Sequence, residues 1–371
     1  MSSQPTRRRG TPTLLTAAMA LAAVALAACS SGTSGTARTS TTPNASASSS
    51  STAGTPASAS AAGSANTGKT LQIAYLSFAV ANSYDAPMLA AAQAVASGEN
   101  AKVTVFDANN NPQTQFAQFQ NAITAGKYDG ILIQPILATN LVDLVKQAVA
   151  KGIKVVDIDQ ILGPDFHTYD PQVPGMSAAV VDRIPDIGRL LGEQVVAACQ
   201  SVNANPCNVG YLYDIKASTL DGVIHDDFMK VVQGTPSIKV VAEGQDFFTP
   251  AGGLKAVQDM LQAHPDLTLI VGSDQGIEGA VQALAAAKKT GKVLLVGFGA
   301  SAAGIQGVAS GQWFSTVAQA PASTGRLGMQ ALIKAIRDGQ DSGGINPTAG
   351  LPNNGIVTKA TASEFTAEWP G

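Results

Sequence analysis

From Leu71 onward, short β-rich runs alternate with longer stretches of helical periodicity, and this alternation strongly limits the possible folds. In the first half, the strand-like runs are 71–78, 102–106, 130–134 and 154–158, and the helical segments are 86–96, 113–125 and 140–151. Strands that alternate with helices of this length form βαβ units, whose strands lie parallel in one sheet. We therefore predict an α/β fold with a doubly wound parallel sheet.

The same rhythm starts again after Asp182. Further strand-like runs follow at 208–212, 239–243, 267–271 and 292–296. With 371 residues, 45% of them hydrophobic, the chain has enough apolar material for two cores. The left-over runs at 314–318, 324–337 and 355–358 are too short for a third domain. We predict two α/β lobes, which these last segments complete.

The N-terminal segment has the pattern of an export signal. Three arginines at 7–9 precede an apolar run at 14–28, which is too short and too rich in alanine for a membrane span. The run ends Leu26-Ala27-Ala28-Cys29, which resembles the bacterial lipoprotein signal, in which the cysteine is acylated after cleavage. We predict a signal peptide over 1–29 with lipidation at Cys29; an ordinary secretory signal is the alternative. Both general secretion and twin-arginine export stay open.

Residues 30–69 are predicted to be a disordered tether. They contain no Val, Ile, Leu, Met or aromatic residue, and their only charges are Arg38 and Lys69. A coil of this length spans about 35 Å. The formal charge is −3, and it becomes −6 without the three arginines of the signal, which argues against a nucleic-acid partner.

The two other cysteines are Cys199 and Cys207, eight positions apart. In an exported chain we predict that they form a disulfide; two buried free thiols are the alternative. A metal site is not expected, because the histidines at 167, 225 and 264 show no ligand spacing with these cysteines.

The sequence carries no convincing catalytic motif. The segment 297–302 is a loose G-x-G-x-x-A, but no Asp or Glu follows between Glu278 and Asp338 to hold a ribose, so a tight turn is the better interpretation. There is no G-x-S-x-G, P-loop or H-E-x-x-H. We expect neither an enzyme nor a cofactor.

Five short segments resemble, in their order, the type I periplasmic binding proteins, the ribose-binding family of bacterial ABC sugar importers. They are 131–135 (ILIQP), 155–160 (VVDIDQ), 271–274 (VGSD), 296–299 (VGFG) and 316–321 (TVAQAP). The resemblance implies two lobes joined by three crossover segments, with a ligand where strand carboxyl ends meet. It puts the first lobe at 70–182 plus 320–350 and the second lobe at 183–319 plus 351–371.

The resemblance also implies ligand-binding residues in the first lobe. Asn82 matches a polar contact and Tyr84 an aromatic wall in the loop that ends at Asp85, although surface packing is the alternative for Tyr84. Gln134 stands where the family often has Asn. Asp159 and Gln160 stand where it commonly has Asp-Arg, so the carboxylate lacks its usual neighbouring cation.

In the second lobe, the family pattern implies a stacking ring at Phe248, whereas Phe247 is expected in the core. Two positions depart from it: Gly299 replaces a ligand-holding Asp, and Gly222 replaces an Arg. The remaining expected ligand contacts of this lobe are Asp221, Ser273, Asp274 and Gln319.

These features together predict a lipid-anchored, extracytoplasmic solute-binding protein. The expected ligand is a small polar molecule, with a sugar or polyol favoured, which hinge closure would capture for an ABC permease. A sensing lobe for a membrane receptor is the alternative. A repressor is disfavoured because no basic helix-turn-helix precedes Leu71, and a hydrolase because no triad can be assigned. We expect a monomer.

Overall fold

The computed structural model of this protein describes residues 68–371. The predicted signal peptide, Cys29 and the tether up to residue 67 lie outside the described residues. Within 68–371, no helix combines the length and the apolar character needed to cross a membrane.

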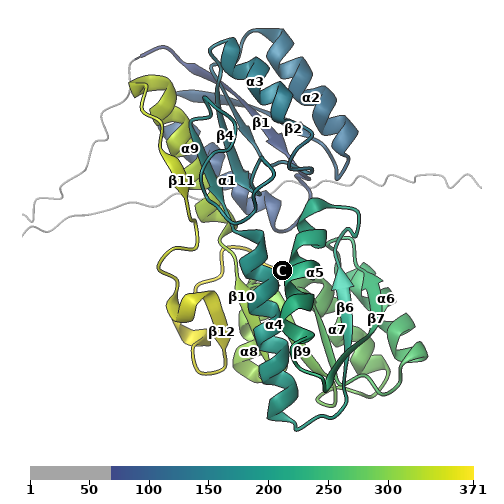
Figure 1. Ribbon diagram of the computed structural model, residues 1–371. Coiled ribbons are helices and arrows are strands. Elements are labelled where there is room, and N and C mark those ends of the chain that lie inside the picture. The colour runs from purple at the N-terminus through teal and green to yellow at the C-terminus, as the bar shows by residue number, and fades with distance from the viewer. Residues whose placement is uncertain (1–67) are drawn as a thin grey trace, which may run out of the picture. The chain divides into compact units, whose positions relative to one another are not determined.

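Strands from the first half of the described chain, joined by β11 from near its end (Figure 1), form a six-stranded, all-parallel sheet. Its strand order is β11-β5-β4-β3-β1-β2. Its strands are β1 (Leu71–Ser77), β2 (Ala101–Asp107), β3 (Gly130–Ile133), β4 (Lys154–Asp159), β5 (Ala178–Val181) and β11 (Gly343–Ile345). Its helices are α1 (Asp85–Gly98), α2 (Pro112–Ala125), α3 (Val142–Ala150) and α9 (Pro321–Asp338). We call these elements the first lobe.

Strand β1 shows why helices cover both faces of this sheet. Its side chains point alternately to opposite faces, as a strand requires. Ile73 packs with Met88 of α1 and with residues of α9, whereas Leu76 packs with Phe119 of α2. Helix α9 approaches α1 closely because residue 325 is glycine: a Cβ there would lie 1.9 Å from the Met88 carbonyl oxygen.

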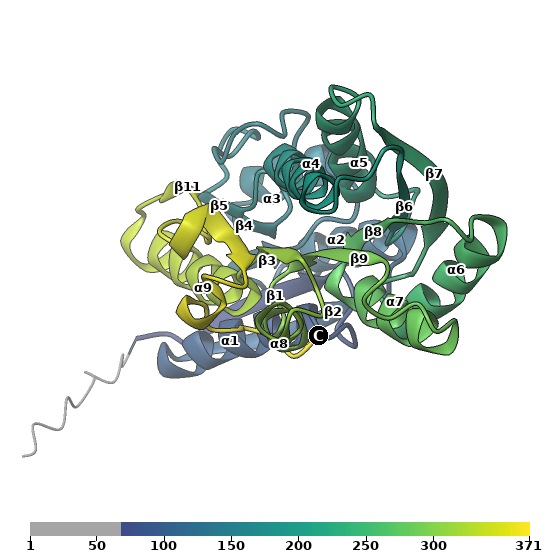
Figure 2. The same ribbon diagram turned by 90° about the horizontal axis from the view of Figure 1, so that it is seen from below.

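The second lobe contains a six-stranded sheet in the order β12-β10-β9-β8-β6-β7, in which only β12 is antiparallel to its neighbour. Its strands are β6 (Cys207–Tyr213), β7 (Ile238–Gln245), β8 (Leu269–Ser273), β9 (Leu294–Gly299), β10 (Ser315–Ala318) and β12 (Ile356–Thr358). Helices α4 (Ile184–Ser201) and α5 (Thr219–Val232) share one core, and α6 (Pro250–Ala263), α7 (Asp274–Ala286) and α8 (Ala302–Ser310) share the other. Figure 2 shows α4 beside α5.

The predicted α/β class with two parallel-sheet lobes is confirmed. Each strand and helix that the periodicity predicts is present, with ends that differ by at most three residues. Strands β5 and β11 were not predicted. Their sequences, AAVV and GGI, are too short to show a period of two.

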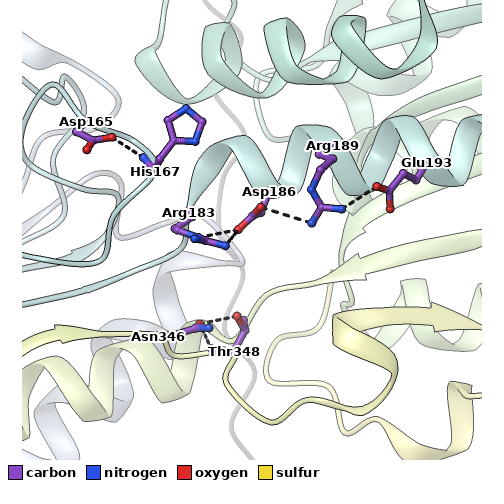
Figure 3. Close-up of polar contacts among 8 residues, drawn as sticks. All are labelled: Asp165, His167, Arg183, Asp186, Arg189, Glu193, Asn346 and Thr348. Atoms are coloured by element: carbon purple, nitrogen blue, oxygen red, sulfur yellow. Dashed lines mark hydrogen bonds and ion pairs between the residues drawn. The ribbon is translucent and has the colours of Figure 1, made fainter. Parts of the chain in front are cut away.

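Three connections join the lobes, at 182–183, 319–320 and 346–355. Near the first, Arg183 donates to Asp186 at 2.7 Å, and Arg189 pairs with both Asp186 and Glu193 along α4 (Figure 3). In the third connection, the Thr348 amide and hydroxyl both donate to Asn346 Oδ1 (Figure 3). The charged side chains beside the first connection therefore form ion pairs with one another along α4 and its N-cap.

The structure contains the predicted bond between Cys199, in α4, and Cys207, at the start of β6. We expect intact-mass analysis of freshly exported protein to find both thiols blocked until reduction, with two alkylated cysteines afterwards. Closing this loop of about nine residues should raise the free energy of unfolding by about 2.5 kcal/mol in the chain-entropy description. Two free thiols before reduction would contradict this.

Candidate ligand-binding site

A cavity lies where the carboxyl ends of the strands of both lobes meet, the position at which open parallel sheets bind ligands. The space in it that can hold the centre of a water-sized sphere is about 40 Å³. Its walls are Phe78, Asn82, Tyr84, Asp85, Gln134, Asp159, Gln160, Leu220, Phe248, Ser273, Gln275, Phe298, Gln319 and Trp369.

Most of the residues expected to bind ligand do line this cavity. From the first lobe these are Asn82, Tyr84, Asp85, Gln134, Asp159 and Gln160, and from the second lobe and the crossover Phe248, Ser273 and Gln319. They follow or end β1, β3, β4, β7, β8 and β10, so the parallel topology brings them together from distant parts of the chain.

Gln134 organises the polar side of the first lobe. Its Nε2 donates to Asp85 Oδ1 at 2.7 Å and to Asp159 Oδ2 at 3.1 Å, and its Oε1 accepts from the Phe78 amide at 3.2 Å. Because Oε1 already accepts a backbone hydrogen bond, the amide group cannot turn over without losing both carboxylate contacts. Gln134 therefore fixes two carboxylates at the wall of the cavity.

Asp159 ends β4 and receives a second donor, the Tyr84 hydroxyl, at 2.8 Å from Oδ1. Its φ is 68°, in the left-handed region that Asp and Asn tolerate better than most residues. The loop before α1 is itself held by Asn82, whose Oδ1 accepts from the Tyr84 amide at 2.7 Å. A non-glycine residue in such a conformation at a cavity wall is a feature typical of functional sites.

The buried carboxylates beside the cavity have raised pKa values. Burial raises the pKa of Asp85 to about 8, against the opposing hydrogen bond from Gln134, and the charge of Asp159 adds to the rise. Burial likewise raises the pKa of Asp159. At the crossover, burial and then the charge of Asp159 raise the pKa of Asp182 to about 7. Among the described residues that line the cavity, none is Lys, Arg or His.

Phe248 lies in the cavity wall as expected, and its ring meets Phe78 edge-on at 6.0 Å between centroids. The expectation for Phe247 is wrong, because this side chain is 57% exposed and not in the core. Both residues have φ near 60°, in a tight turn between β7 and α6. Successive side chains of such a turn point in different directions, so only one of the two rings faces the cavity.

Asp221 is not brought to the cavity. Its Oδ1 accepts from the Asp214 amide at 2.6 Å, and its Oδ2 accepts from the Ile215 amide at 3.0 Å and from the Ser218 hydroxyl at 2.7 Å. The carboxylate therefore stabilises the loop between β6 and α5. It accepts hydrogen bonds from backbone amides of this loop that are not bonded within either element. It is a structural residue in this conformation.

Asp274 is also buried outside the cavity. Its Oδ1 accepts from the Thr316 hydroxyl and its Oδ2 from the Ser301 amide, each at 2.7 Å. These bonds tie α7 to β10 and to the start of α8. The preceding residue, Ser273, does line the cavity and also caps α7 by accepting from the Gly276 amide.

Five lining residues were not predicted: Phe78, Leu220, Gln275, Phe298 and Trp369. Phe78, Gln275 and Phe298 stand within or beside segments already expected at strand ends, so their position was the available signal. No local sequence pattern indicates Leu220 or Trp369 as lining residues, because tertiary packing alone brings each of them to the cavity.

Side chains of the two lobes touch around the cavity. Gln275 Nε2 donates to Ser83 Oγ at 3.4 Å, and Gln319 Nε2 donates to Asp182 Oδ2 at 3.4 Å. Phe248 of the second lobe packs with Phe78 and Ala79 of the first. The conformation described is therefore one in which the lobes are closed over the site.

Comparison with known proteins agrees with this geometry. The model of the periplasmic binding protein domain family matches residues 73–341. The D-xylose-binding periplasmic protein of Escherichia coli is 31% identical over 58% of this chain and 63% of its own length. The D-allose-binding periplasmic protein of the same organism is 28% identical over 62% of this chain and 72% of its own.

Solved structures share the fold. A solute-binding protein of an ABC transporter from Mycobacterium smegmatis, with bound glycerol, has a TM-score of 0.68 at 24% identity and covers 82% of this chain and all of its own. One from Bacillus halodurans, with bound myo-inositol, has the same TM-score at 20% identity and covers 81% of this chain and 98% of its own. Because the family model matches most of the chain, this protein belongs to the periplasmic binding protein domain family.

Proposed function

We propose that the protein captures a small, neutral, polyhydroxylated ligand, a sugar or a polyol, and delivers it to an ABC importer. The observation that carries the proposal is the composition of the cavity. Carboxylates, amides and aromatic rings line it together, and no cationic side chain lines it among the described residues.

This composition suits a sugar in two ways. Asp85, Asp159 and the amide groups of Gln134, Gln160 and Gln319 offer hydrogen-bond acceptors and donors for the hydroxyl groups of a sugar. The rings of Tyr84 and Phe248 offer faces against which apolar C–H groups can pack.

The relatives support the same conclusion. They include proteins named as D-xylose-binding, D-allose-binding and ribose import binding proteins. Membership of a periplasmic family places the working protein outside the cytoplasm. We propose that it acts as a monomer and needs no cofactor.

Transport requires that closure depend on the ligand. We infer that the ligand binds side chains of both lobes and so favours the closed form, which the permease recognises. The Gln319–Asp182 and Ser83–Gln275 contacts would form as the lobes approach.

A thermal-shift panel tests the ligand class. D-xylose, D-allose, D-ribose and myo-inositol should include at least one ligand that raises the melting temperature, since a ligand at about 100 times its Kd adds about 2.7 kcal/mol of stability. D-ribose 5-phosphate and D-xylonate are matched anionic controls. They should leave the melting temperature unchanged, because the part of the chain that the structure describes lines the cavity with carboxylates and with no cation to neutralise an anion. Preferential stabilisation by the anions would contradict the proposal.

We further propose that Cys29 carries a lipid anchor and that residues 30–69 let the folded lobes reach a membrane partner. Both rest on the sequence, since Cys29 lies outside the described residues. Cys29→Ser should move tagged protein from the membrane fraction to the soluble fraction of producing cells. Equal distribution of wild type and variant would contradict the anchor.

A further inference from the structure

The indole of Trp369 forms part of the cavity wall although it comes from a segment outside both sheets. The side chain is 4% exposed, and its ring meets Tyr84 of the first lobe edge-on at 5.4 Å between centroids. Tyr84 in turn donates to Asp159. Trp369 thus contacts an aromatic ring that the proposed function assigns to the ligand, and this ring is hydrogen-bonded to Asp159.

Backbone hydrogen bonds hold Trp369 on the second lobe. Its carbonyl oxygen accepts from the Ala302 amide at 2.9 Å, and the Pro370 oxygen accepts from the Ala303 amide at 3.1 Å. These amides belong to the first turn of α8, where no intrahelical partner exists. The indole Nε1 donates to the Gly299 oxygen at 2.8 Å, so the ring plane is fixed as well.

The residue before it binds the other lobe. Glu368 accepts from the Ser323 amide at 2.7 Å and from the Ser323 hydroxyl at 2.6 Å. Ser323 lies in the first turn of α9, where a carboxylate is favoured by the helix dipole. Residues 368–370 therefore fasten the indole to both lobes beside the crossover at 319–320.

The indole also explains why residue 299 is glycine. Gly299 ends β9 with a φ of 132°, and a Cβ there would lie 2.4 Å from Trp369 Cζ2. The room that a side chain at this strand end would occupy is filled by the tryptophan ring.

We propose that Trp369 is a specificity-determining residue of the ligand cavity, selecting sugars or polyols that present an apolar C–H surface to the indole. This inference rests on the proposed function. The Gly299–Trp369 pair excludes a polar group from this wall, so a ligand hydroxyl directed here would lose its hydration without gaining a partner.

Fluorescence tests the position of the indole. The chain has two tryptophans, and Trp313 is buried in the core of the second lobe. In the Trp313→Phe protein, a sugar from the thermal-shift panel should change the emission of Trp369. In the Trp369→Phe protein the same sugar should leave emission nearly unchanged. The reverse pattern would overturn the inference.

Calorimetric titration tests selection. Trp369→Ala should weaken the binding of the panel sugar for which wild type has the highest affinity by about 10- to 100-fold, and it should change the order of affinities among the sugars. Trp313→Phe should change neither the affinity nor the order. If the alanine variant does not fold, Trp369→Phe takes its place. This variant should change the order of affinities to a smaller extent. If wild type binds panel sugars and both Trp369 variants keep the wild-type order of affinities, this inference is overturned and the proposed function is not. No binding of any panel sugar by wild type would overturn the proposed function and this inference together.

Discussion

Replacing Asp159 with asparagine should weaken ligand binding by roughly 100-fold or more. The substitution keeps the size of the side chain and suits the left-handed backbone at this position. It turns one carboxylate oxygen into an NH₂ group, whereas both oxygens now accept hydrogen bonds, from Tyr84 and from Gln134. Hydrogen bonds to charged groups contribute about 1.5–3 kcal/mol each, and 2.7 kcal/mol corresponds to about 100-fold.

Asp157→Asn is the matched control for this prediction. Asp157 lies two residues earlier on β4, is fully buried, and does not line the cavity. Calorimetric titration with the panel sugar that wild type binds most tightly should give Asp157→Asn nearly the affinity of wild type. Circular dichroism should confirm that both variants are folded. Equal affinities for all three proteins would mean that Asp159 does not hold the ligand.

The second large effect concerns pH: the protein should be more stable near pH 5 than near pH 8. Burial raises the pKa of several aspartates, to about 8 for Asp157 and Asp85 and to about 7 for Asp246 and Asp182. A carboxyl group with a raised pKa binds more protons in the folded state than in the unfolded state. Its stabilisation is complete below the unfolded pKa of about 4 and is lost as the pH rises through the folded pKa.

This window runs from about pH 4 to pH 8, and several kcal/mol are lost across it. The melting temperature should fall by roughly 10 °C between pH 5 and pH 8, measured by differential scanning calorimetry without ligand. A melting temperature that rises over this interval would contradict the prediction.

Asp157→Asn isolates one contribution to this pH effect. One oxygen of Asp157 accepts from the Leu162 amide at 2.7 Å, which asparagine can retain, and the other has no hydrogen-bond partner within residues 68–371. The variant should gain stability relative to wild type at pH 8 and gain little at pH 5, because it has no proton to lose. Asp259→Asn, at an exposed carboxylate on α6 that pairs with Lys255, serves as the surface control for the same substitution.

The alternation of strand-like and helical runs was enough to predict two parallel-sheet lobes. The prediction is possible because few other arrangements bury the apolar residues of strands covered on both faces and of helices of this length. Strand ends could be placed to within three residues, and the carboxyl ends of parallel strands converge at one edge. The family resemblance implied that Gln134, Asp159, Ser273 and Gln319 lie at this edge, and this convergence of strand ends agrees with it.

The direction of each side chain depended on tertiary structure. Asp221 and Asp274 stand at the expected strand and helix ends, yet each carboxylate points to backbone amides of its own lobe. Such a choice depends on which unpaired donors surround the group after folding, because an unpaired buried amide is costly.

Trp369 marks the limit of sequence inference most clearly. No periodicity or motif connects it with Gly299, 70 positions earlier, and only packing brings the indole over that glycine. The sequence determined the two lobes and the edge at which they meet, because strand and helix periods are local properties. The tertiary structure alone decided which rings and carboxylates form the cavity wall, because that depends on contacts between residues far apart in the chain.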